Sequence, residues 1–404
     1  MIREMKDSGI AWIGEIPKGW KVELIGNQVK EVCCPNIDCK ENNALQFKMG
    51  SIISKSKGNS KYTPETLEGY NVVDKGVIML NGLNLSFDFI SQRIGLVKER
   101  GVITSTYIAI KPTNSIDSEF LTYLFKAYDN CKVFHSMGKG LRQTLSYGEL
   151  KKYQLLYPNI KEQQKIAEFL DRKCGEIDEL VALQEKMIEE LKAYKQSVIT
   201  EAVTKGLNPN VSMKDSGIEW IDYVPQHWKI RKMKSIIDLK SGSNLTAMEI
   251  SEMDDGYLVY GGNGVRGTYG YYSHEGDYVL IGRQGALCGN INYASGKFWV
   301  TEHALVCYLK ERCALKWLGE LLRAMDLNQY SLSAAQPGLS AERIRNLYII
   351  VPPLTEQQQI ADYLDRKCAE IDELVALKQQ KIDSLKEYKK SLIYEYVTGK
   401  KEVI

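Results

Sequence analysis

The sequence predicts an α+β fold in which two small mixed α/β domains are joined by two long antiparallel helices of the coiled-coil type. Two repeats support this prediction. A long amphipathic stretch occurs twice, 194 residues apart, and a shorter aromatic segment occurs twice, 208 residues apart. The segments between the repeats keep the same order of expected strands and helix, although their residues differ. The chain is therefore an internal duplication with pseudo-two-fold character.

The aromatic segment covers Met5–Val22 and returns as Met213–Ile230. The two copies hold four of the six Trp residues of the chain, spaced eight apart within each copy: Trp12, Trp20, Trp220 and Trp228. We expect these segments to dock and pin each half by packing, and a ligand site is the alternative. A linker is expected at Lys205–Ser212, where Gly206 suits the end of a helix.

The middle domains share an expected strand, loop, strand and helix. The first strand is Lys75–Leu80 in one half and Glu275–Ile281 in the other, followed by loops at Asn81–Asn84 and Gly282–Gly285. A second strand is expected over Gly101–Pro112 and over Phe298–Leu309, and a helix over Ser118–Tyr128 and over Leu315–Met325. These runs alternate with turn residues in the manner of a small mixed sheet covered by a helix.

The glycine-rich stretch Tyr260–Tyr272 is open to more than one interpretation. A phosphate-binding loop would need a helix after it, and none is expected here. Two readings remain: a plain hairpin with exposed tyrosines, and a loop that contacts DNA through Asn263, Arg266 and an aromatic side chain.

The first long stretch runs from Glu162 to Thr204 and the second from Glu356 to Thr398, with about 28 of the 43 aligned positions identical. Neither contains Pro, and strong helix formers dominate, so each predicts one helix. Apolar residues recur every three or four positions, as in a coiled-coil seam. The seam comprises Leu170, Cys174, Ile177, Val181, Ile188, Leu191 and Val198, widened by Leu180, Met187 and Tyr194, and in the second copy Leu364, Cys368, Ile371, Val375, Ile382, Leu385 and Leu392.

A helix of this length, about 65 Å at ~1.5 Å per residue, cannot bury its apolar stripe alone. Its own copy is the economical partner, and antiparallel pairing suits a duplicated chain. Polar residues interrupt the seam at Gln184 and Lys378, and we expect them to set the register of the pair. The predicted domains are 1–159, 160–206, 207–353 and 354–404, in the order first domain, helix, second domain, helix.

Composition narrows the class of protein. The chain has 404 residues, a net charge of +2 and nine Cys. An odd number of scattered cysteines favours free thiols in the cytoplasm, and no apolar run approaches a membrane span. Cys33, Cys34 and Cys39 form the only cysteine cluster, but the paired spacing of a zinc site is missing, so no metal is predicted.

No catalytic constellation is present. The sequence lacks a Ser nucleophile elbow and a Walker A loop. The nearest approach to the Asn-Pro-Pro-aromatic mark of an adenine methyltransferase is Val351–Leu354, which lacks both the Asn and the aromatic residue. His303 is expected to be a half-buried histidine in a strand rather than a metal ligand. We therefore predict that the chain is not an enzyme.

The order of parts resembles the specificity subunit of type I restriction-modification systems. In each half, a docking segment and a variable domain lead into a helix that opens with a Pro, Glu-Gln and Ile-Ala pattern. The residues that carry the resemblance are Pro158, Glu162, Gln163, Ile166, Leu170, Asp171, Ile177 and Asp178, and in the second copy Pro353, Glu356, Gln357, Ile360, Leu364, Asp365, Ile371 and Asp372. The segments "YGGNGVRG" and "FWVTEHALV" also look like target-recognition sequence of that family.

The resemblance implies a division of labour. The variable domains would be target recognition domains, each reading one half of a bipartite, asymmetric site in double-stranded DNA. The helices would dock two modification (methyltransferase) subunits, which restriction (translocase/nuclease) subunits then join. No cofactor is expected on this chain, because S-adenosylmethionine, ATP and Mg belong to the partner subunits. The alternative is a coiled-coil scaffold or decoy that binds methyltransferase subunits but no DNA, which the modest net charge favours.

Base reading needs amide, hydroxyl and guanidinium groups at loop tips, with cations nearby for phosphates. We expect more than half of the following residues to line the DNA face: Lys55, Lys57, Asn81, Asn84, Arg93, Arg142 and Gln143 in the first domain, and Ser243, Asn244, Asn263, Arg266, Arg283, Gln284 and Gln336 in the second.

Overall fold

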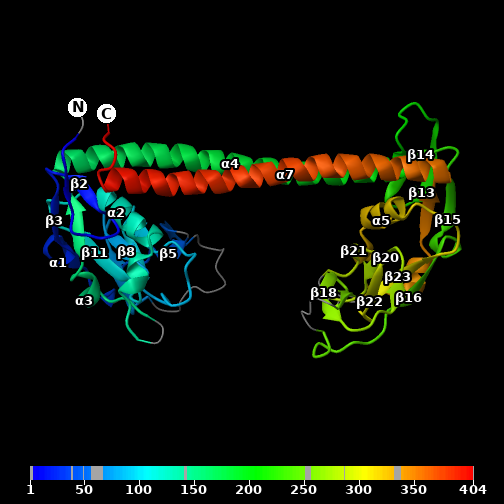
Figure 1. Cartoon of the computed structure of the whole chain (residues 1–404), viewed down its shortest axis with the longest axis horizontal. Helices are drawn as coiled ribbons and strands as arrows, with labels where there is room; N and C mark the ends of the chain where they lie inside the picture. Colours follow the sequence, from blue (N-terminus) through cyan, green and yellow to red (C-terminus); the bar gives the residue numbers. More distant parts are fainter. Residues whose placement is uncertain are drawn as a thin grey trace. The chain divides into compact units, whose positions relative to one another are not determined.

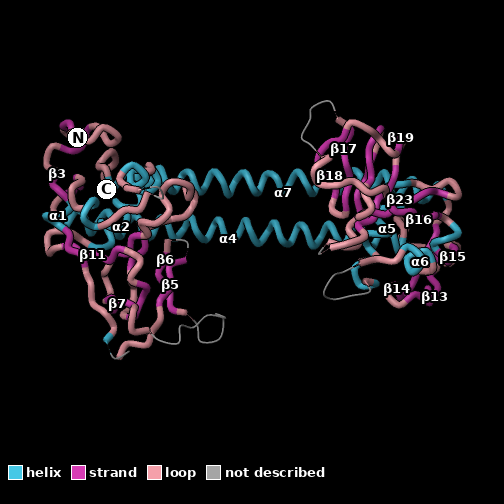
Figure 2. The backbone as a smooth tube through the Cα atoms, turned by 90° about the horizontal axis from the view of Figure 1, so that it is seen from below, coloured by secondary structure: helices cyan, strands magenta, loops and turns pink. Residues whose placement is uncertain are grey.

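The chain forms two compact units. Unit 1 consists of the described parts of Met1–Gln184 and Gln380–Ile404, and unit 2 is built from Glu185–Gln379. The computed structural model describes residues 3–37, 40–48, 50–55, 67–140, 143–250, 256–285, 287–331 and 338–403. Two long helices, α4 (Ile160–Lys205) and α7 (Leu354–Val397), each contribute to both units. Figure 2 shows each of them as one continuous helix.

The remaining elements of unit 1 follow the order expected from the sequence (Figure 1). They are β1 (Met5–Asp7), β2 (Glu15–Pro17), β3 (Lys21–Leu24), α1 (Ile25–Gln28), β4 (Val29–Glu31), β5 (Leu45–Lys48), β6 (Ser51–Ser54), β7 (Tyr70–Val73), β8 (Ile78–Leu80), β9 (Ile94–Leu96), β10 (Gly101–Thr104), β11 (Ile108–Pro112), α2 (Ser118–Asn130), η2 (Val133–Ser136), α3 (Tyr147–Leu150) and β12 (Gln154–Tyr157).

Unit 2 repeats this order. Its elements are β13 (Met213–Ile218), β14 (Ile221–Pro225), β15 (Lys229–Lys232), η3 (Met233–Ser235), β16 (Ile237–Ser241), β17 (Tyr257–Gly261), β18 (Gly264–Tyr269), β19 (His274–Glu275), β20 (Tyr278–Gly282), β21 (Ile291–Ala294), β22 (Lys297–Val300), β23 (Ala304–Leu309), α5 (Leu315–Ala324), η4 (Leu327–Tyr330), α6 (Ala341–Arg345) and β24 (Tyr348–Val351).

The main sheets of the two units have the same topology. Four antiparallel strands run in the order β4-β11-β8-β9 in unit 1 and β16-β23-β20-β21 in unit 2. The β8–β9 loop and the β20–β21 loop are therefore equivalent positions on a duplicated scaffold. The hairpins β5–β6 and β17–β18 also correspond. In unit 1 Ala44, just before β5, forms a parallel bridge to Val102 of β10, and in unit 2 β17 pairs in parallel with β22. The strands β10 and β22 are equivalent, because each directly precedes the second strand of its main sheet, β11 or β23.

Two expected strands are each split in the structure. Gly101–Pro112 forms β10 and β11, and Phe298–Leu309 forms β22 and β23. In each case the chain turns and the second strand joins a different sheet from the first. The expectation that His303 lies in a strand is therefore wrong, since it occupies the turn between β22 and β23. The expected helices are confirmed as α2 and α5.

The signature glutamines bind each domain to its long helix. The buried Gln163 donates to the carbonyls of Pro158 (2.9 Å) and Ser115 (3.0 Å) and accepts from the backbone of Asp117 (2.8 Å), the N-cap of α2. Gln357 likewise donates to the Pro352 carbonyl (3.0 Å) and accepts from the backbone of Ala314 (3.0 Å), the N-cap of α5. The start of each long helix thereby fixes the helix that covers the sheet.

The tryptophans pin each half, as the sequence predicted. The indole N–H of the buried Trp20 donates to Glu162 (3.2 Å) in α4, and that of Trp228 donates to Glu356 (2.9 Å) in α7. A methyl group added at Gly206, which directly follows α4 and has φ +77°, would lie 3.1 Å from the Trp228 ring. In unit 2, Trp228 therefore packs between the start of one long helix and the end of the other.

The long helices pair in an antiparallel manner. In unit 1 Asp178 of α4 bonds Lys389 of α7 (2.6 Å), and the rings of Phe169 and Tyr396 lie 4.5 Å apart. In unit 2 the equivalent ion pair joins Lys195 to Asp372 (2.6 Å). The predicted seam residues are buried or half-buried.

Two residues that were expected to widen the seam lie outside it. Leu180 and Tyr194 are about half exposed, because the stripe that faces the other helix is narrower than the apolar pattern suggested. Gln184 and Lys378 are both half-buried, and their role in the register stays a prediction. No helix in the described parts of the chain combines the length and apolar character needed to cross a membrane.

Candidate nucleic-acid interface

Three segments of unit 2 converge on one place. They are the two-residue turn Gly262-Asn263 of the β17–β18 hairpin, the β20–β21 loop and the β22–β23 turn. A methyl group added at Gly262 would lie 3.0 Å from the carbonyl oxygen of His303 and 3.2 Å from that of Gln284, and one added at Gly282 would overlap the carbonyl of Gly262. Only glycine lets the three backbones approach so closely.

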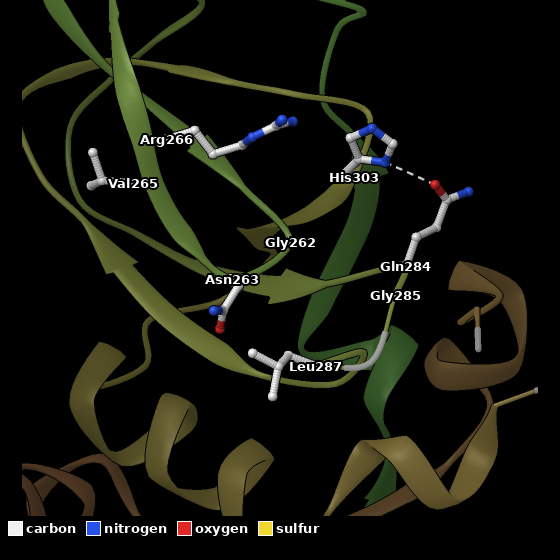
Figure 3. A pocket seen from close by; sticks show the side chains of 8 residues that line it. All are labelled: Gly262, Asn263, Val265, Arg266, Gln284, Gly285, Leu287 and His303. Atoms are coloured by element: carbon white, nitrogen blue, oxygen red, sulfur yellow. Dashed lines mark hydrogen bonds between the residues drawn. The ribbon is translucent and has the colours of Figure 1, made fainter. Parts of the chain in front are cut away.

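An open pocket of about 450 Å³ lies among these segments (Figure 3). Its lining residues are Gly262, Asn263, Val265, Arg266, Gln284, Gly285, Leu287 and His303. Amide and guanidinium groups alternate with the exposed apolar side chains of Val265 and Leu287. This mixture matches the base edges of a DNA groove, which offer donors, acceptors and thymine methyl groups.

Hydrogen bonds orient the polar side chains of the pocket. The ring of His303 bonds Gln284 through Nδ1 (2.8 Å, drawn in Figure 3) and lies 3.1 Å from Glu302 through Nε2. The side chain of Asn290 donates to that of Asn263 (2.8 Å). Gln284 and Asn263 are therefore exposed but held by neighbours, which lowers the entropy they would lose on binding.

A second pocket of about 430 Å³ shares Gln284 with the first. It is lined by Arg283, Gln284, Gly338, Leu339, Ser340, Ala341 and Glu342. The backbone of Leu339 donates to the Arg283 carbonyl (2.9 Å), and the Arg283 guanidinium donates to Ser241 (2.6 Å). Arg283 is half-buried as a result, whereas Ser243 and Asn244 are exposed just beyond β16.

Unit 1 has an equivalent arrangement around the β8–β9 loop. The backbone of Leu145 donates to the Gly82 carbonyl (2.9 Å), which matches the bond from Leu339 to Arg283 in unit 2. The backbone of Leu85 donates to the carbonyl of Gln143 (3.2 Å). The structure thus brings the exposed Asn84 and the exposed Gln143 to the same edge of the unit.

The prediction that Arg93 lines the DNA face is wrong. Its side chain is 0% exposed, so it cannot reach a base or a phosphate. The guanidinium donates to the backbone carbonyls of Asn81 (3.1 Å), Leu83 (2.7 Å) and Asp88 (2.6 Å). Arg93 therefore organises the β8–β9 loop from within, because a planar fork of five donors can serve several carbonyls at once.

The other candidates of unit 1 are placed differently. Asn81 is half-buried, and its side chain accepts from the backbone of Leu83 (3.1 Å). Lys55 directly follows β6 and lies at the open end of the β5–β6 hairpin. It is therefore far from the turn of this hairpin, which is the part that corresponds to Gly262-Asn263 in unit 2. Lys57, Arg142 and Gln336 lie outside the described residues.

Sequence reasoning missed several residues at these sites. Val265, Leu287 and His303 line the pocket of unit 2, and the exposed Gln92 of unit 1 lies against Gly50 at the turn of the β5–β6 hairpin. Val265 adjoins Arg266 and Gln92 adjoins Arg93 in the sequence, which was the available signal, whereas His303 reaches Gln284 only through the fold. Within the residues that the structure describes, no group of three or more His, Cys, Asp or Glu could hold a metal ion.

Comparison with known proteins decides the family. Residues 45–193 and 225–387 match the type I restriction modification DNA specificity domain. The chain belongs to this family. Residues of both units fall within the match, in agreement with the duplicated topology.

Relatives span different parts of the chain. It is 39% identical over 141 residues to the type I restriction enzyme EcoprrI specificity subunit of Escherichia coli, a match that spans 34% of this chain and only 35% of that relative. It is 22% identical to the MjaVIII specificity subunit of Methanocaldococcus jannaschii, across 95% of this chain and 93% of the relative.

Solved structures of the family share the fold. The chain superposes with a TM-score of 0.74 and 14% identity on a chain from a study of complex assembly and conformational transition of the type I restriction-modification system, covering 95% of this chain and 99% of the other. The HsdS subunit from Thermoanaerobacter tengcongensis gives a TM-score of 0.54 at 15% identity, with coverage of 95% and 98%.

Proposed function

We propose that this chain is the DNA-reading subunit of a type I restriction-modification complex and that each unit reads one half of a bipartite, asymmetric site. The observation that carries the proposal is that two sheets of identical strand order present different side chains from equivalent loops. The chain itself transfers no methyl group and cuts no DNA. The scaffold is common to both units, so the half-sites differ because the loops differ.

The exposed groups suit direct readout of base edges. In unit 2 Asn263, Arg266 and Gln284 can bond base edges, while Val265 and Leu287 can contact thymine methyl groups. In unit 1 Asn84 and Gln143 occupy the corresponding edge. Ser243 and Asn244, which are exposed just beyond β16, would place unit 2 on the backbone of the duplex.

The long helices would dock two copies of one partner. Leu180 and Leu183 of α4 are about half exposed, and the antiparallel register places them at the level of the half-exposed Tyr388 in unit 1. In unit 2 the equivalent patch combines Leu374 and Leu377 of α7 with Tyr194 of α4. Each pair of leucines lies in the same hexapeptide, "DELVAL". Two matching apolar patches support docking of two methyltransferase subunits.

The patches alone would equally suit the scaffold or decoy function, so DNA binding is the property to test. The chain is purified with and without its co-expressed methyltransferase partner, and binding to a random-sequence duplex is measured from about 50 to 200 mM salt. We expect the complex to bind with affinity that falls steeply as salt rises, because phosphate contacts release counterions.

Two controls accompany the binding measurement. The chain alone is incubated with duplex and labelled S-adenosylmethionine, and no label should reach the DNA. Labelled DNA from the isolated chain would disprove the non-catalytic assignment. If the complex does not bind DNA, or binds it with an affinity that does not change with salt, the scaffold function is favoured instead.

A further inference from the structure

The β8–β9 loop of unit 1 exposes three large apolar side chains within four residues. Phe87 is 65% exposed, Phe89 53% and Ile90 94%. Isolated apolar residues are common on protein surfaces, but a cluster of this size usually marks a binding surface. None of the residues expected from the sequence to contact DNA accounts for it.

The loop is held rigidly from below. The buried guanidinium of Arg93 bonds three of its carbonyls, as described above, and the backbone N–H of Arg93 donates to the buried Asp129 (2.9 Å). Burial raises the pKa of the Asp129 carboxyl. An arginine that is fully buried beneath an exposed loop costs desolvation energy, which indicates that the shape of the loop matters.

Further bonds fix the tip. The Asp88 carboxylate accepts from the backbones of Ile90 (3.2 Å) and Ser91 (3.0 Å). These bonds, chiefly the one from the Ser91 backbone, lower the pKa of the Asp88 carboxyl. Lys132 donates to the Phe89 carbonyl (2.5 Å), and the Phe89 ring stacks on His135 at 4.8 Å. Phe87 and Ile90 are thus presented to solvent by a preorganised loop.

The position of the loop indicates its partner. It occupies the place on the sheet that the β20–β21 loop occupies in unit 2, where the 55% exposed Leu287 lines the pocket beside Gln284. The backbone of Leu85 in the same loop bonds Gln143. Both units therefore place exposed apolar side chains among the amide groups that would read bases.

We propose that Phe87 and Ile90 make an apolar contact with the base pairs of the DNA half-site read by unit 1. This inference rests on the proposed function and names a binding element for it. Two geometries give such a contact. The side chains can pack on thymine methyl groups in the major groove, or they can wedge between stacked base pairs.

The test compares Phe87→Ser/Ile90→Ser with Ile37→Ser, which alters another exposed isoleucine of unit 1 (66% exposed). The DNA motif is first obtained by sequencing the methylation pattern of a host that carries the wild-type complex. Each complex is then titrated with a duplex that carries this motif. We expect the double variant to bind about 10- to 100-fold more weakly, with unchanged Tm, and Ile37→Ser to bind like wild type.

Modified duplexes distinguish the two geometries. If the contact is with thymine methyl groups, replacing thymine by uracil in the first half-site weakens binding of the wild type but not of the double variant. If the side chains form a wedge, 2-aminopurine placed in that half-site becomes more fluorescent with the wild type and not with the variant. Either result supports the apolar contact.

Three results would show whether the apolar contact or the proposed function is wrong. Equal affinity of the double variant and wild type for the motif duplex would overturn the inference while leaving the proposed function intact. A variant that loses its methyltransferase partner but keeps its DNA affinity would overturn it in favour of protein docking. A wild-type complex without any DNA motif would instead overturn the proposed function.

Discussion

At the scale of single residues, the amide of Gln284 illustrates how the site could choose a base. The ring of His303 lies between two acceptors, the Glu302 carboxylate (3.1 Å) and the Gln284 side-chain oxygen (2.8 Å). The contact with Nδ1 engages the side-chain oxygen of Gln284, so the NH2 group of Gln284 remains available as a donor. Gln284 would then read a base edge that offers an acceptor.

Replacing Gln284 by Glu should change one base of the second half-site. Glutamate has the same shape, but its second carboxylate oxygen can only accept, so the preferred base edge should become one that carries an amino group. His303→Ala should instead release the side chain and relax the preference at that position. Sequencing of the methylated motif in cells measures both effects, and an unchanged motif in Gln284→Glu would exclude Gln284 from readout.

Residue roles could be predicted from the sequence only where the type of residue dictates its environment. Trp20 and Trp228 were expected to be anchors and are, because a large aromatic ring rarely stays exposed. Arg93 was expected at the surface and is buried. Its role depends on carbonyls that converge only when the β8–β9 loop folds, which no local pattern reveals.

At the scale of elements, the long helices carry the clearest signal. Their extents agree with the predicted stretches to within about two residues, because a seam sustained over many turns is hard to misread. The short strands were less predictable: the turns that split two of them depend on sheet pairing. The exposure of Leu180 was missed because periodicity does not show how wide the buried stripe is.

The apolar patches on the helices predict the stoichiometry of the complex. In Leu180→Ser/Leu183→Ser one patch is lost while the seam is kept, so we expect one methyltransferase subunit per chain instead of two. Leu374→Ser/Leu377→Ser should remove the other copy, and all four changes together should remove both. Native mass spectrometry of the co-expressed complex gives the count.

A matched control separates docking from folding. Leu207→Ser alters another partly exposed leucine outside the long helices and should leave two subunits bound. Each variant should also keep the Tm of the wild type, because the altered side chains are about half exposed. Two subunits bound to every variant would show that the partner docks elsewhere.

At the scale of the whole molecule, duplication explains how one chain could read an asymmetric sequence. The helices keep about 28 of 43 aligned positions, among them the exposed leucines of "DELVAL", which suits two copies of one partner. The domains keep one topology but differ in their loops, which suits two different half-sites. The duplication and the pairing of the loops at Asn81–Asn84 and Gly282–Gly285 were evident in the sequence, whereas the shared strand order of the two main sheets needed the structure.

The most direct test of this division of labour exchanges one domain. Residues 229–353 are replaced by the equivalent domain of a relative whose methylated motif is known, and the methylation pattern of the host genome is sequenced. We predict a gapped, asymmetric adenine-methylated motif in which one half comes from the relative and the other half is unchanged. A change in both halves, or a motif that does not change at all, would contradict the account.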